Sequence, residues 1–525
     1  MIPRIVHQTW KNASIPEDLT GYAESWQRFH PDWQHCFWTD ADLAQLVEDH
    51  FPVYRDLFHA YQLPVMRADL GRYLMLKKFG GVYADLDAEA LAAFDPLLDS
   101  GVPVFAYEPA SHAALEFVQR RGFRHLISNA IMASPPGHPL WDHLLTFIVR
   151  CRSARGPLDA TGPFVLTAAI ERFEGHPPPC VLPAHVFSPI DKFGNPVAAA
   201  PADPKPLAAH HWKGSWFSPP AVASRTAPGS FSRLKRWHCH VRDEVWGGFR
   251  DRRFLASIDK QLIGRAAPSG RQVLIAIPVR DAADSLDGLF KAILKLDYRR
   301  SHLSIAFVEG DSGDDSLARL SAFAADHAGG FRRIALIKRD LGLRLDVPRW
   351  HPSSQRRRRS NIARARNALM REALQDEDWV LWIDSDIVEF PADVLNLLLA
   401  TGARIVHPNA VRQVGAMSMD LNAWVIERQV SREAMQAWMR DRLYQPPPGH
   451  ERLYLSDLRY LDRVMLDSVG CTMLLVDANL HRAGLIFPER PYRSMIETEA
   501  FASAALELGV SAVGLPNLEI LHAPR

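Results

Sequence analysis

Paired carboxylates are the residues of this sequence with the clearest capacity for chemistry. Asp85 and Asp87 follow a strand-like run at residues 80–84, and Asp384 and Asp386 follow another at residues 379–383. Side chains two positions apart lie on one face of a strand, so each pair can direct two carboxylates at one point. Such oxygen ligands suit Mg²⁺ or Mn²⁺, and open α/β sheets bind ligands beyond the carboxyl ends of their strands. We therefore predict two sites where a metal ion bridges a diphosphate, with turn formation as the alternative for each pair.

The same Asp-x-Asp triplet occurs twice more, in surroundings that favour structural roles. Asp40 and Asp42 precede an amphipathic run, where acidic residues cap a helix and suit its dipole. Asp376 and Asp378 lie in a polar turn before the apolar run at residues 379–383, where we expect them to be solvated. Neither pair is assigned to a site.

Alternating strand and helix patterns must position the two remaining pairs. A chain of 525 residues is too long for one core, and the alternation runs through residues 1–216 and again through residues 271–525. This predicts two α/β domains joined by a linker at residues 217–270, which is first rich in Pro and Ser and then basic and aromatic. No residue-level repeat relates the halves, which indicates a fusion of different modules.

Composition limits the partners and the compartment. Lys plus Arg number 61 and Asp plus Glu number 60, which argues against a surface built for nucleic acid. The five cysteines are scattered, and the N-terminus enters a strand pattern at once, without a signal peptide. We therefore expect a cytoplasmic protein. For residues 228–265 we expect a helix that packs its aromatics between the domains, and we keep peripheral membrane contact as the alternative.

A longer pattern surrounds the first acid pair. Residues 67–87 read Arg-Ala-Asp-x-x-Arg-Tyr-x-x-Leu-x-x-x-Gly-Gly-Val-Tyr-x-Asp-x-Asp. Together with residues 5–10, 129–133, 162–163 and 210–216, this pattern resembles glycosyltransferase family 32. That family contains the DxD sugar-transferases that initiate fungal mannosylation and many enzymes of capsular polysaccharide. The resemblance covers about residues 1–216.

The resemblance implies a role for each matched side chain of the first domain. Asp85 and Asp87 would hold the metal, with His211 as a third ligand, although a histidine beside tryptophans is more often structural. Asp69 and Arg72 would hold the sugar and act in catalysis, although at this spacing they are equally an ordinary ion pair on a helix. The implied donor-binding residues of this domain are Trp10, Asp69, Arg72 and Tyr83.

The second domain combines a run of arginines with several strand ends. Residues 355–367 carry the arginines, and acidic or polar residues end strand patterns at 277–283, 309–312 and 384–386. An arginine run is typical of a solvated or nucleic-acid-binding patch, yet planar guanidinium groups also suit a diphosphate. The neighbouring acids favour a nucleotide-sugar site. The predicted donor-binding residues are Pro278, Arg280, Glu309, Asp311, Arg364, Arg366 and Asn367.

These segments, with residues 406–409, 469–470, 496–499 and 513–516, look like glycosyltransferase family 62, the mannan polymerase subunits that use GDP-mannose. The likeness spans about residues 271–525. It implies metal ligands at Asp384 and Asp386, a terminal ligand at His522, and acceptor or transition-state contacts from Glu497 or Glu499. Residues 409–469 match weakly, so mannan itself is not implied as the product.

We therefore expect two metal-dependent nucleotide-diphospho-sugar transferase domains of the GT-A type in tandem, using Mn²⁺ or Mg²⁺. By the resemblance, both would retain the anomeric configuration, and the second would take GDP-mannose and transfer the sugar to a glycan or polysaccharide acceptor. One alternative is a protein of polysaccharide assembly or glycan binding with an inactive domain. Another is a sugar nucleotidyltransferase, although neither N-terminal strand is followed by a convincing Gly-rich triphosphate loop.

Overall fold

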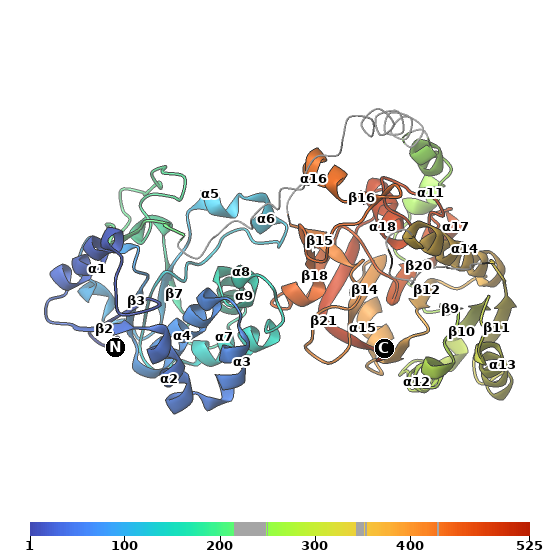
Figure 1. The fold of residues 1–525 in the computed structure, drawn as a ribbon, viewed down its shortest axis with the longest axis horizontal. Helices are drawn as coiled ribbons and strands as arrows, with labels where there is room; N and C mark the ends of the chain where they lie inside the picture. The colour runs from blue at the N-terminus through green and yellow to red at the C-terminus, as the bar shows by residue number, and fades with distance from the viewer. Residues whose placement is uncertain (215–247, 249, 343–350, 352–353, 428–429, 525) are drawn as a thin grey trace. The chain divides into compact units, whose positions relative to one another are not determined.

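The computed structural model describes residues 1–214, 248, 250–342, 351, 354–427 and 430–524. Two compact units make up the chain (Figure 1). The first unit comprises Met1–Val222 together with Asp457–Leu461, and the second comprises Ala223–Ser456 together with Asp462–Arg525. The chain therefore passes from one unit to the other at three points along its sequence.

The first unit is built on a mixed sheet. Among the described residues its strand order is β2 (Gln34–Trp38), β1 (Ile5–Thr9), β3 (Gly81–Ala84), β6 (Ile131–Ser134), β5 (Val104–Ala106) and β7 (Cys180–Leu182). A separate antiparallel pair, β4 (Ala88–Ala90) and β8 (Ala208–His210), lies just beyond the end of β3. The larger helices are α1 (Glu17–Phe29), α2 (Asp40–His50), α4 (Pro64–Phe79), α7 (Pro139–Arg150) and α9 (Pro163–Glu171).

The turn between α4 and β3 requires its two glycines. Gly80 and Gly81 have φ angles of +66° and +93°, in the left-handed region that side chains with a Cβ rarely adopt. A Cβ added at Gly81 would lie 2.6 Å from the carbonyl oxygen of Ile5 in the neighbouring strand. The glycine pair therefore lets β3 run directly alongside β1, which fixes where the following acids emerge.

The second unit is built on a larger mixed sheet. Among the described residues its order is β11 (Arg333–Lys338), β10 (Leu303–Glu309), β9 (Val273–Val279), β12 (Trp379–Ile383), β20 (Met473–Asp477), β14 (Ile405–Val411), β21 (Ala512–His522) and β13 (Ile387–Glu389), with β19 (Val464–Leu466) on β21. β11, β10, β9 and β12 are parallel neighbours. Every residue of β10 and β12 is buried; β12 is apolar throughout, whereas β10 also buries Ser304 and Glu309.

Helices connect the strands of the second unit. The larger ones are α12 (Ala283–Leu294), α13 (Ser316–Asp326), α14 (Gln355–Ala373), α15 (Val394–Ala400) and α18 (Thr498–Glu507). Shorter elements of the two units are α3 (Arg55–Ala60), α5 (Ala110–Ala113), α6 (Glu116–Gln119), α8 (Pro157–Ala160), α11 (Lys260–Ile263), β15 (Trp424–Ile426), α16 (Arg432–Ala437), β16 (Met439–Arg440), β17 (Leu443–Tyr444), β18 (Arg452–Tyr454) and α17 (Ala478–Arg482).

A short segment distant in sequence completes the first unit. Within Asp457–Leu461, Tyr460 is 1% exposed, and its hydroxyl donates a 2.6 Å hydrogen bond to Asp159. Its ring stacks on those of Phe123 and Phe164, with centroids 6.0 and 6.5 Å away. Asp159 also accepts two hydrogen bonds from Arg121, at 2.7 and 2.8 Å. The sequence analysis placed this segment in the second domain and did not anticipate its packing.

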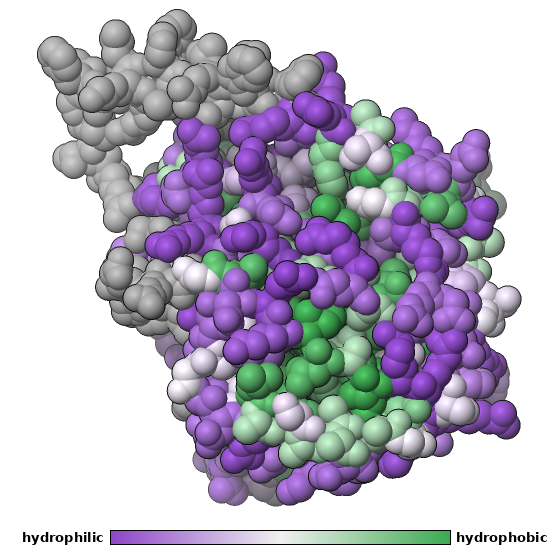
Figure 2. All heavy atoms as spheres, turned by 90° about the vertical axis from the view of Figure 1, so that its right-hand side faces the viewer, coloured by the Kyte–Doolittle hydropathy of each residue, from purple (hydrophilic) through white to green (hydrophobic). Residues whose placement is uncertain are grey.

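The predicted linker is only partly described. Of residues 217–270, positions 217–247 and 249 lie outside the described residues, as does most of the predicted basic and aromatic helix. Farther along, Asp259 caps α11, and its backbone N–H donates to Ala483 in the second unit. Among the described residues, no helix is both long and apolar enough to cross a membrane. The face shown in Figure 2 is largely hydrophilic with one apolar area.

Candidate active sites

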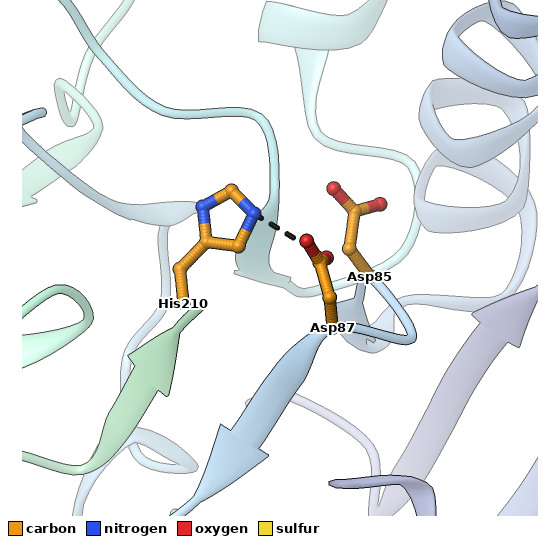
Figure 3. A group of neighbouring side chains, drawn as sticks. All are labelled: Asp85, Asp87 and His210. Carbon is orange, nitrogen blue, oxygen red and sulfur yellow. Dashed lines mark ion pairs between the residues drawn. The ribbon is translucent and has the colours of Figure 1, made fainter. Parts of the chain in front are cut away.

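The acids of the first unit meet one histidine. Asp85 follows β3, Asp87 precedes β4, and His210 ends β8, where it pairs in register with Ala88. One ligand atom from each of these three side chains lies within 4.8 Å of the others, and His210 Nε2 is 3.4 Å from Asp87 Oδ1 (Figure 3). Two carboxylates and an imidazole are a donor set suited to Mn²⁺ or Mg²⁺. These residues therefore fit a divalent metal ion.

The histidine that faces these acids is not the predicted one. His211 points instead to Glu89, with its Nε2 3.0 Å from Oε2, and its ring stacks on Tyr22 at 4.2 Å. Consecutive residues of a strand face opposite sides, so a shift of one position exchanges the two histidines. The structure thus replaces His211 with His210 as the candidate third ligand.

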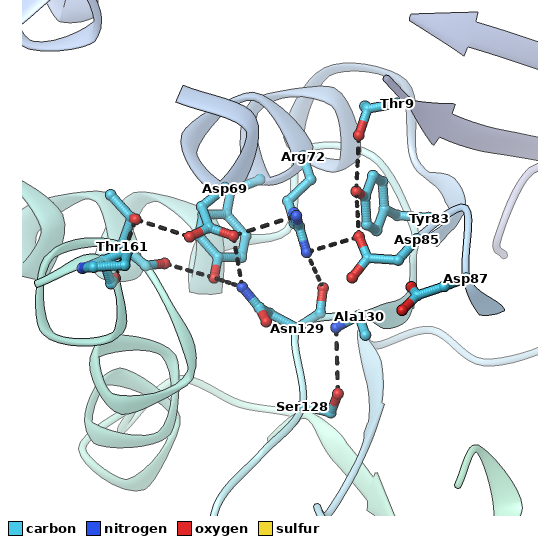
Figure 4. Close-up of polar contacts among 12 residues, drawn as sticks. Thr9, Asp69, Arg72, Tyr83, Asp85, Asp87, Ser128, Asn129, Ala130 and Thr161 are labelled. Carbon is cyan, nitrogen blue, oxygen red and sulfur yellow. Dashed lines mark hydrogen bonds and ion pairs between the residues drawn. The ribbon is translucent and has the colours of Figure 1, made fainter. Parts of the chain in front are cut away.

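A buried polar network supports Asp85 (Figure 4). Arg72 Nη1 lies 3.1 Å from Asp85 Oδ1, and its Nη2 lies 3.3 Å from Asp69 Oδ1. Asp69 also accepts hydrogen bonds of 2.9 Å from Asn129 and 2.9 Å from Thr161. Asp69 and Arg72 are 4% and 6% exposed, so the guanidinium is fixed between the two carboxylates. Their predicted contacts with the sugar stay a prediction.

Burial and charge oppose each other at this site. Burial raises the pKa of Asp69 to about 6, although Arg72 and the hydroxyl of Thr161 act against it. Burial also raises the pKa of Asp85, again against Arg72. At Asp87 burial acts in the same direction, but hydrogen bonding and charge from His210 outweigh it and lower the pKa. Asp87 is therefore the acid that stays ionised most readily at neutral pH.

Two predicted donor contacts of the first unit lie in different surroundings. Tyr83 is fully buried, and its hydroxyl donates a 2.7 Å hydrogen bond to Asp85 Oδ1 while it contacts Thr9 at 3.0 Å. Its prediction as a donor contact is corrected, because it has no surface for a ligand and positions Asp85. Trp10 follows β1, is partly exposed, and packs near Leu86, which separates the two acids. Trp10 thus lies where a base could stack beside the acids.

The second unit has the same types of residue at corresponding places in its sheet. Asp384 follows β12, Asp386 precedes β13, and His522 ends β21, where it pairs in register with Ile387. His522 Nε2 lies 2.9 Å from Asp386 Oδ2. Arg366 of α14 is 3% exposed at its side chain, and its Nη2 lies 2.7 Å from Asp384 Oδ1. In both units an arginine on the preceding helix contacts the first acid, and a strand-ending histidine contacts the second.

Burial dominates the electrostatics of the second acid pair. It raises the pKa of Asp384 to about 7, opposed by Arg366 and reinforced by the charges of Asp386 and Glu497. The charge of Asp386 therefore disfavours ionisation of Asp384, and a divalent cation would relieve that repulsion. Asp384, Asp386 and His522 offer the donor types that suit a hard metal ion, but their ligand atoms do not meet the 4.8 Å spacing found for Asp85, Asp87 and His210 among the described residues.

The predicted Glu497 and Glu499 stand at the start of α18, facing arginines of α14. Glu497 has a φ of +63°, which is strained for a residue with a Cβ, and it forms a buried ion pair with Arg366. Glu499 lies 2.8 Å from Arg359 and accepts a 3.2 Å hydrogen bond from Trp424 Nε1. Arg366 thus links Glu497 to the first acid of the pair.

Three predicted donor contacts of the second unit lie at the same edge of the sheet. Arg280 follows β9 and Glu309 ends β10, and both strands run parallel to β12, which ends before Asp384. Asp311 follows β10 and accepts hydrogen bonds from the backbone N–H groups of Leu341 and Gly342, at 2.9 and 3.0 Å. The predicted convergence of strand ends is therefore present, and Asp311 also holds a loop.

The remaining predicted contacts have other surroundings. Arg364 is exposed on α14 and donates a weak 3.4 Å hydrogen bond to Asn361, so it does not face the acids as predicted. Asn367 is 1% exposed, and its amide both donates to and accepts from the backbone of Phe487. It braces that segment and has no free group for a donor. Pro278 lies within β9 and is partly exposed.

Sequence reasoning missed several charged residues of the second site. Asp420 pairs with His407, with Nε2 3.4 Å from Oδ2, and accepts a 2.9 Å hydrogen bond from Thr472. Burial favours a higher pKa for Asp420, but the hydrogen bond and charge of His407 outweigh it and lower the pKa. His407 fell within a quoted segment, whereas Asp420 lies in the weakly matched stretch. Arg359 could have been predicted as a site residue, because it lies two helical turns before Arg366 and therefore on the same face of α14.

Two family profiles match different parts of the chain. The profile of the Anp1 family matches residues 261–491, and that of the glycosyltransferase sugar-binding region containing the DXD motif matches residues 16–102. The mannan polymerase complex subunit mnn9 of Schizosaccharomyces pombe is 31% identical over 48% of this chain and 80% of its own length. The chain belongs to the Anp1 family. The expected glycosyltransferase class is thereby confirmed, and the two mixed sheets agree with tandem GT-A type domains.

Other relatives match a shorter part of the chain. Inositol phosphoceramide mannosyltransferase 2 of Schizosaccharomyces pombe is 34% identical over 28% of this chain. This chain spans only 38% of that relative's length. Among solved structures, the mannosyltransferase PcManGT from Pyrobaculum calidifontis in complex with GDP-Man and Mn²⁺ is 16% identical, with a TM-score of 0.30, over 56% of this chain and 68% of that one.

Proposed function

We propose that each unit is a metal-dependent retaining sugar transferase and that the chain carries two activities. The repeated constellation of arginine, two acids and histidine supports this proposal. Arg72, Asp85, Asp87 and His210 form it in the first unit. Arg366, Asp384, Asp386 and His522 form it in the second. The two halves of the sequence show no detectable repeat, so the recurrence of these residue types at corresponding sheet positions supports similar chemistry in both units.

The residues of each site have distinct roles in the proposed reaction. The acids and the histidine would hold a divalent cation, which neutralises the diphosphate as the sugar leaves. Arg72 and Arg366 hold the first acid of each pair in place and add positive charge next to the leaving group. Neither site needs a dedicated protein base if the departing phosphate oxygen accepts the proton of the acceptor hydroxyl.

GDP-mannose is the donor that we propose for the second unit. The Anp1 profile matches residues 261–491, and the chain's relatives include subunits of mannan polymerase complexes, among them mnn9 of Schizosaccharomyces pombe. Other relatives are mannosyltransferases named for inositol phosphoceramide. We propose a mannosyl donor for the second unit and leave the donor of the first to a screen of nucleotide sugars.

The test uses the full chain, because the first unit includes residues 457–461. Asp384→Asn with Asp386→Asn should lower Mn²⁺-dependent hydrolysis of GDP-mannose about 100-fold or more, because both carboxylates that would hold the cation are lost. Asp376→Asn is the matched control. Asp376 belongs to another Asp-x-Asp triplet, is mostly exposed, and pairs with Arg332 at the surface.

The corresponding change at Asp85 and Asp87 should remove a second transfer activity while hydrolysis of GDP-mannose persists. If either double variant stayed folded and lost both activities, a single composite activity would replace two separate ones. Wild-type protein that binds glycans but hydrolyses no nucleotide sugar would favour the role in polysaccharide assembly. Release of pyrophosphate from a nucleoside triphosphate would favour the nucleotidyltransferase.

A further inference from the structure

A polar cavity of about 390 Å³ opens beside the first turns of α14 in the second unit. Its lining includes Arg358 and Arg359 from that helix and Arg452 from β18. Tyr444 and Glu499 also line it. None of these residues was predicted to bind the donor or the metal, whereas Glu499 was predicted to contact the acceptor or the transition state.

Positive charge is in excess in this cavity. The lining holds three guanidinium groups, and Glu499 is the single carboxylate among the lining residues. That carboxylate is shared, with Oε2 2.8 Å from Arg359 and Oε1 3.4 Å from Arg452. A cavity with such an excess attracts anions, and planar guanidinium groups suit phosphate or carboxylate oxygens.

The other walls suit a sugar. Tyr444 and Tyr454 are the aromatic residues of the lining, and the Arg452 guanidinium lies 5.4 Å from the Tyr444 ring centroid and 4.3 Å from that of Trp424, which is not part of the lining. The hydroxyl of Tyr444 is buried and has no hydrogen-bond partner among the described residues. Asn422 also lines the cavity and accepts a 3.0 Å hydrogen bond from Arg359. Aromatic faces beside a few planar polar groups are what small-molecule sites use to fix orientation.

The cavity lies at the catalytic edge of the sheet. α14 leads into β12, whose far end precedes Asp384, so the helix begins near the edge where that strand ends. Arg359 and Arg366 are seven residues apart on one face of the helix, a rise of about 10 Å. Glu499 contacts the first arginine and Glu497 the second. The start of α18 therefore connects the two places: Glu499 lines the cavity, and Glu497, two residues earlier, contacts the arginine that holds Asp384.

We propose that this cavity binds the acceptor and that the acceptor is a glycan with an anionic group, either phosphate or carboxylate. The inference rests on the transferase activity proposed above and names the acceptor class for that site. Arg358, Arg359 and Arg452 hold the anion, while the aromatic side chains and Asn422 hold the sugar that carries it. The accepting hydroxyl then lies on a sugar that reaches past the turn toward Asp384.

Binding without a donor tests the proposal independently of catalysis. The full chain with Mn²⁺ is titrated in a calorimeter with methyl α-mannoside, with its 6-phosphate and with the corresponding uronic acid. At least one anionic ligand should bind tenfold or more tightly than the neutral sugar, and the ratio between the two shows whether phosphate or carboxylate is preferred. Inorganic phosphate alone should compete with the preferred ligand.

Two neighbouring arginines provide a matched pair of variants. Arg358→Gln should abolish the preference for the anionic sugar, whereas Arg357→Gln should keep it, because Arg357 is exposed on the same helix and does not line the cavity. Arg358→Lys keeps the charge but loses the planar fork, so it should give an intermediate preference. It also serves if the glutamine variant does not fold.

The results separate this inference from the proposed function. If the wild-type protein hydrolysed no GDP-mannose, the proposed transferase activity would be rejected. The binding preference would still show whether the cavity selects anionic sugars. Equal affinity for neutral and anionic sugars would overturn the inference. It would also be overturned if both glutamine variants lost the preference equally, or if GDP without metal displaced the anionic sugar, since these results indicate general attraction or the donor site.

Discussion

Replacing Tyr460 should destabilise the first unit, although its sequence neighbours belong to the second. The buried hydroxyl donates a 2.6 Å hydrogen bond to Asp159, which stays paired with Arg121 when the hydroxyl is removed. A hydrogen bond to a charged group contributes about 1.5–3 kcal/mol. Tyr460→Phe should therefore raise the unfolding equilibrium constant of the first unit by roughly 10- to 160-fold. Tyr460→Ala also removes stacking on Phe123 and Phe164 and should cost about 3–5 kcal/mol.

Hydrogen exchange resolved by peptide distinguishes the two units. In Tyr460→Phe, slowly exchanging amides of β6 and α9 should lose protection by that factor, while those of β12 and β20 keep theirs. Tyr492→Phe is the matched control, because its hydroxyl donates an equally short 2.6 Å hydrogen bond to Glu507 within the second unit. It should give the opposite pattern. Loss of protection in β12 and β20 with α9 unchanged in Tyr460→Phe would refute the assignment of this segment to the first unit.

Three further predictions concern pH, backbone and metal. Burial lowers the pKa of His481 from 6.5 to about 4, so its stabilising contribution is complete above pH 6.5 and is lost as the pH falls toward 4. At pH 5 urea denaturation should find the second unit about 2 kcal/mol less stable than at pH 7.5, and His481→Asn should reduce this dependence. Gly81→Ala should destabilise the first unit by about 1–3 kcal/mol or more in the same assay, whereas Gly21→Ala, in a helix with open space, should stabilise it by up to about 1 kcal/mol. His210→Ala should weaken Mn²⁺ binding at the first site about tenfold or more by calorimetry, and His211→Ala should change it little; equal effects would return His211 to the ligand set.

The parts of the sites that lie at strand ends could be predicted from the sequence. Continuous apolar runs identify buried strands, and the residues after them must emerge at an edge of the sheet. This reasoning brought Asp85, Asp87, Asp384 and Asp386 to the correct positions after β3 and β12. His522 was instead implied by the resemblance to glycosyltransferase family 62, and its neighbour in register is the residue after Asp386.

The sequence did not predict which face of a strand or helix a residue lies on, or which residues distant in sequence come into contact. His210 and His211 are adjacent, and only the pairing of β8 with β4 decides which of them faces the acids. Arg364 was predicted to bind the donor and Arg359 was not. The buried face of α14 includes Ala363, Arg366 and Met370, and Arg364 is not on that face. This error could have been avoided by following the helical period.

The composition of the first unit has a consequence for synthesis on the ribosome. Its N-terminal part ends at Val222, but its final segment ends at Leu461, roughly 240 residues later. At about 5–20 residues per second, translation needs roughly 10–50 s to cover that interval. Until then Phe123, Phe164 and Asp159 lack the ring and hydroxyl that cover them in the finished protein. The first unit therefore remains incompletely packed on the ribosome while most of the second unit is synthesised.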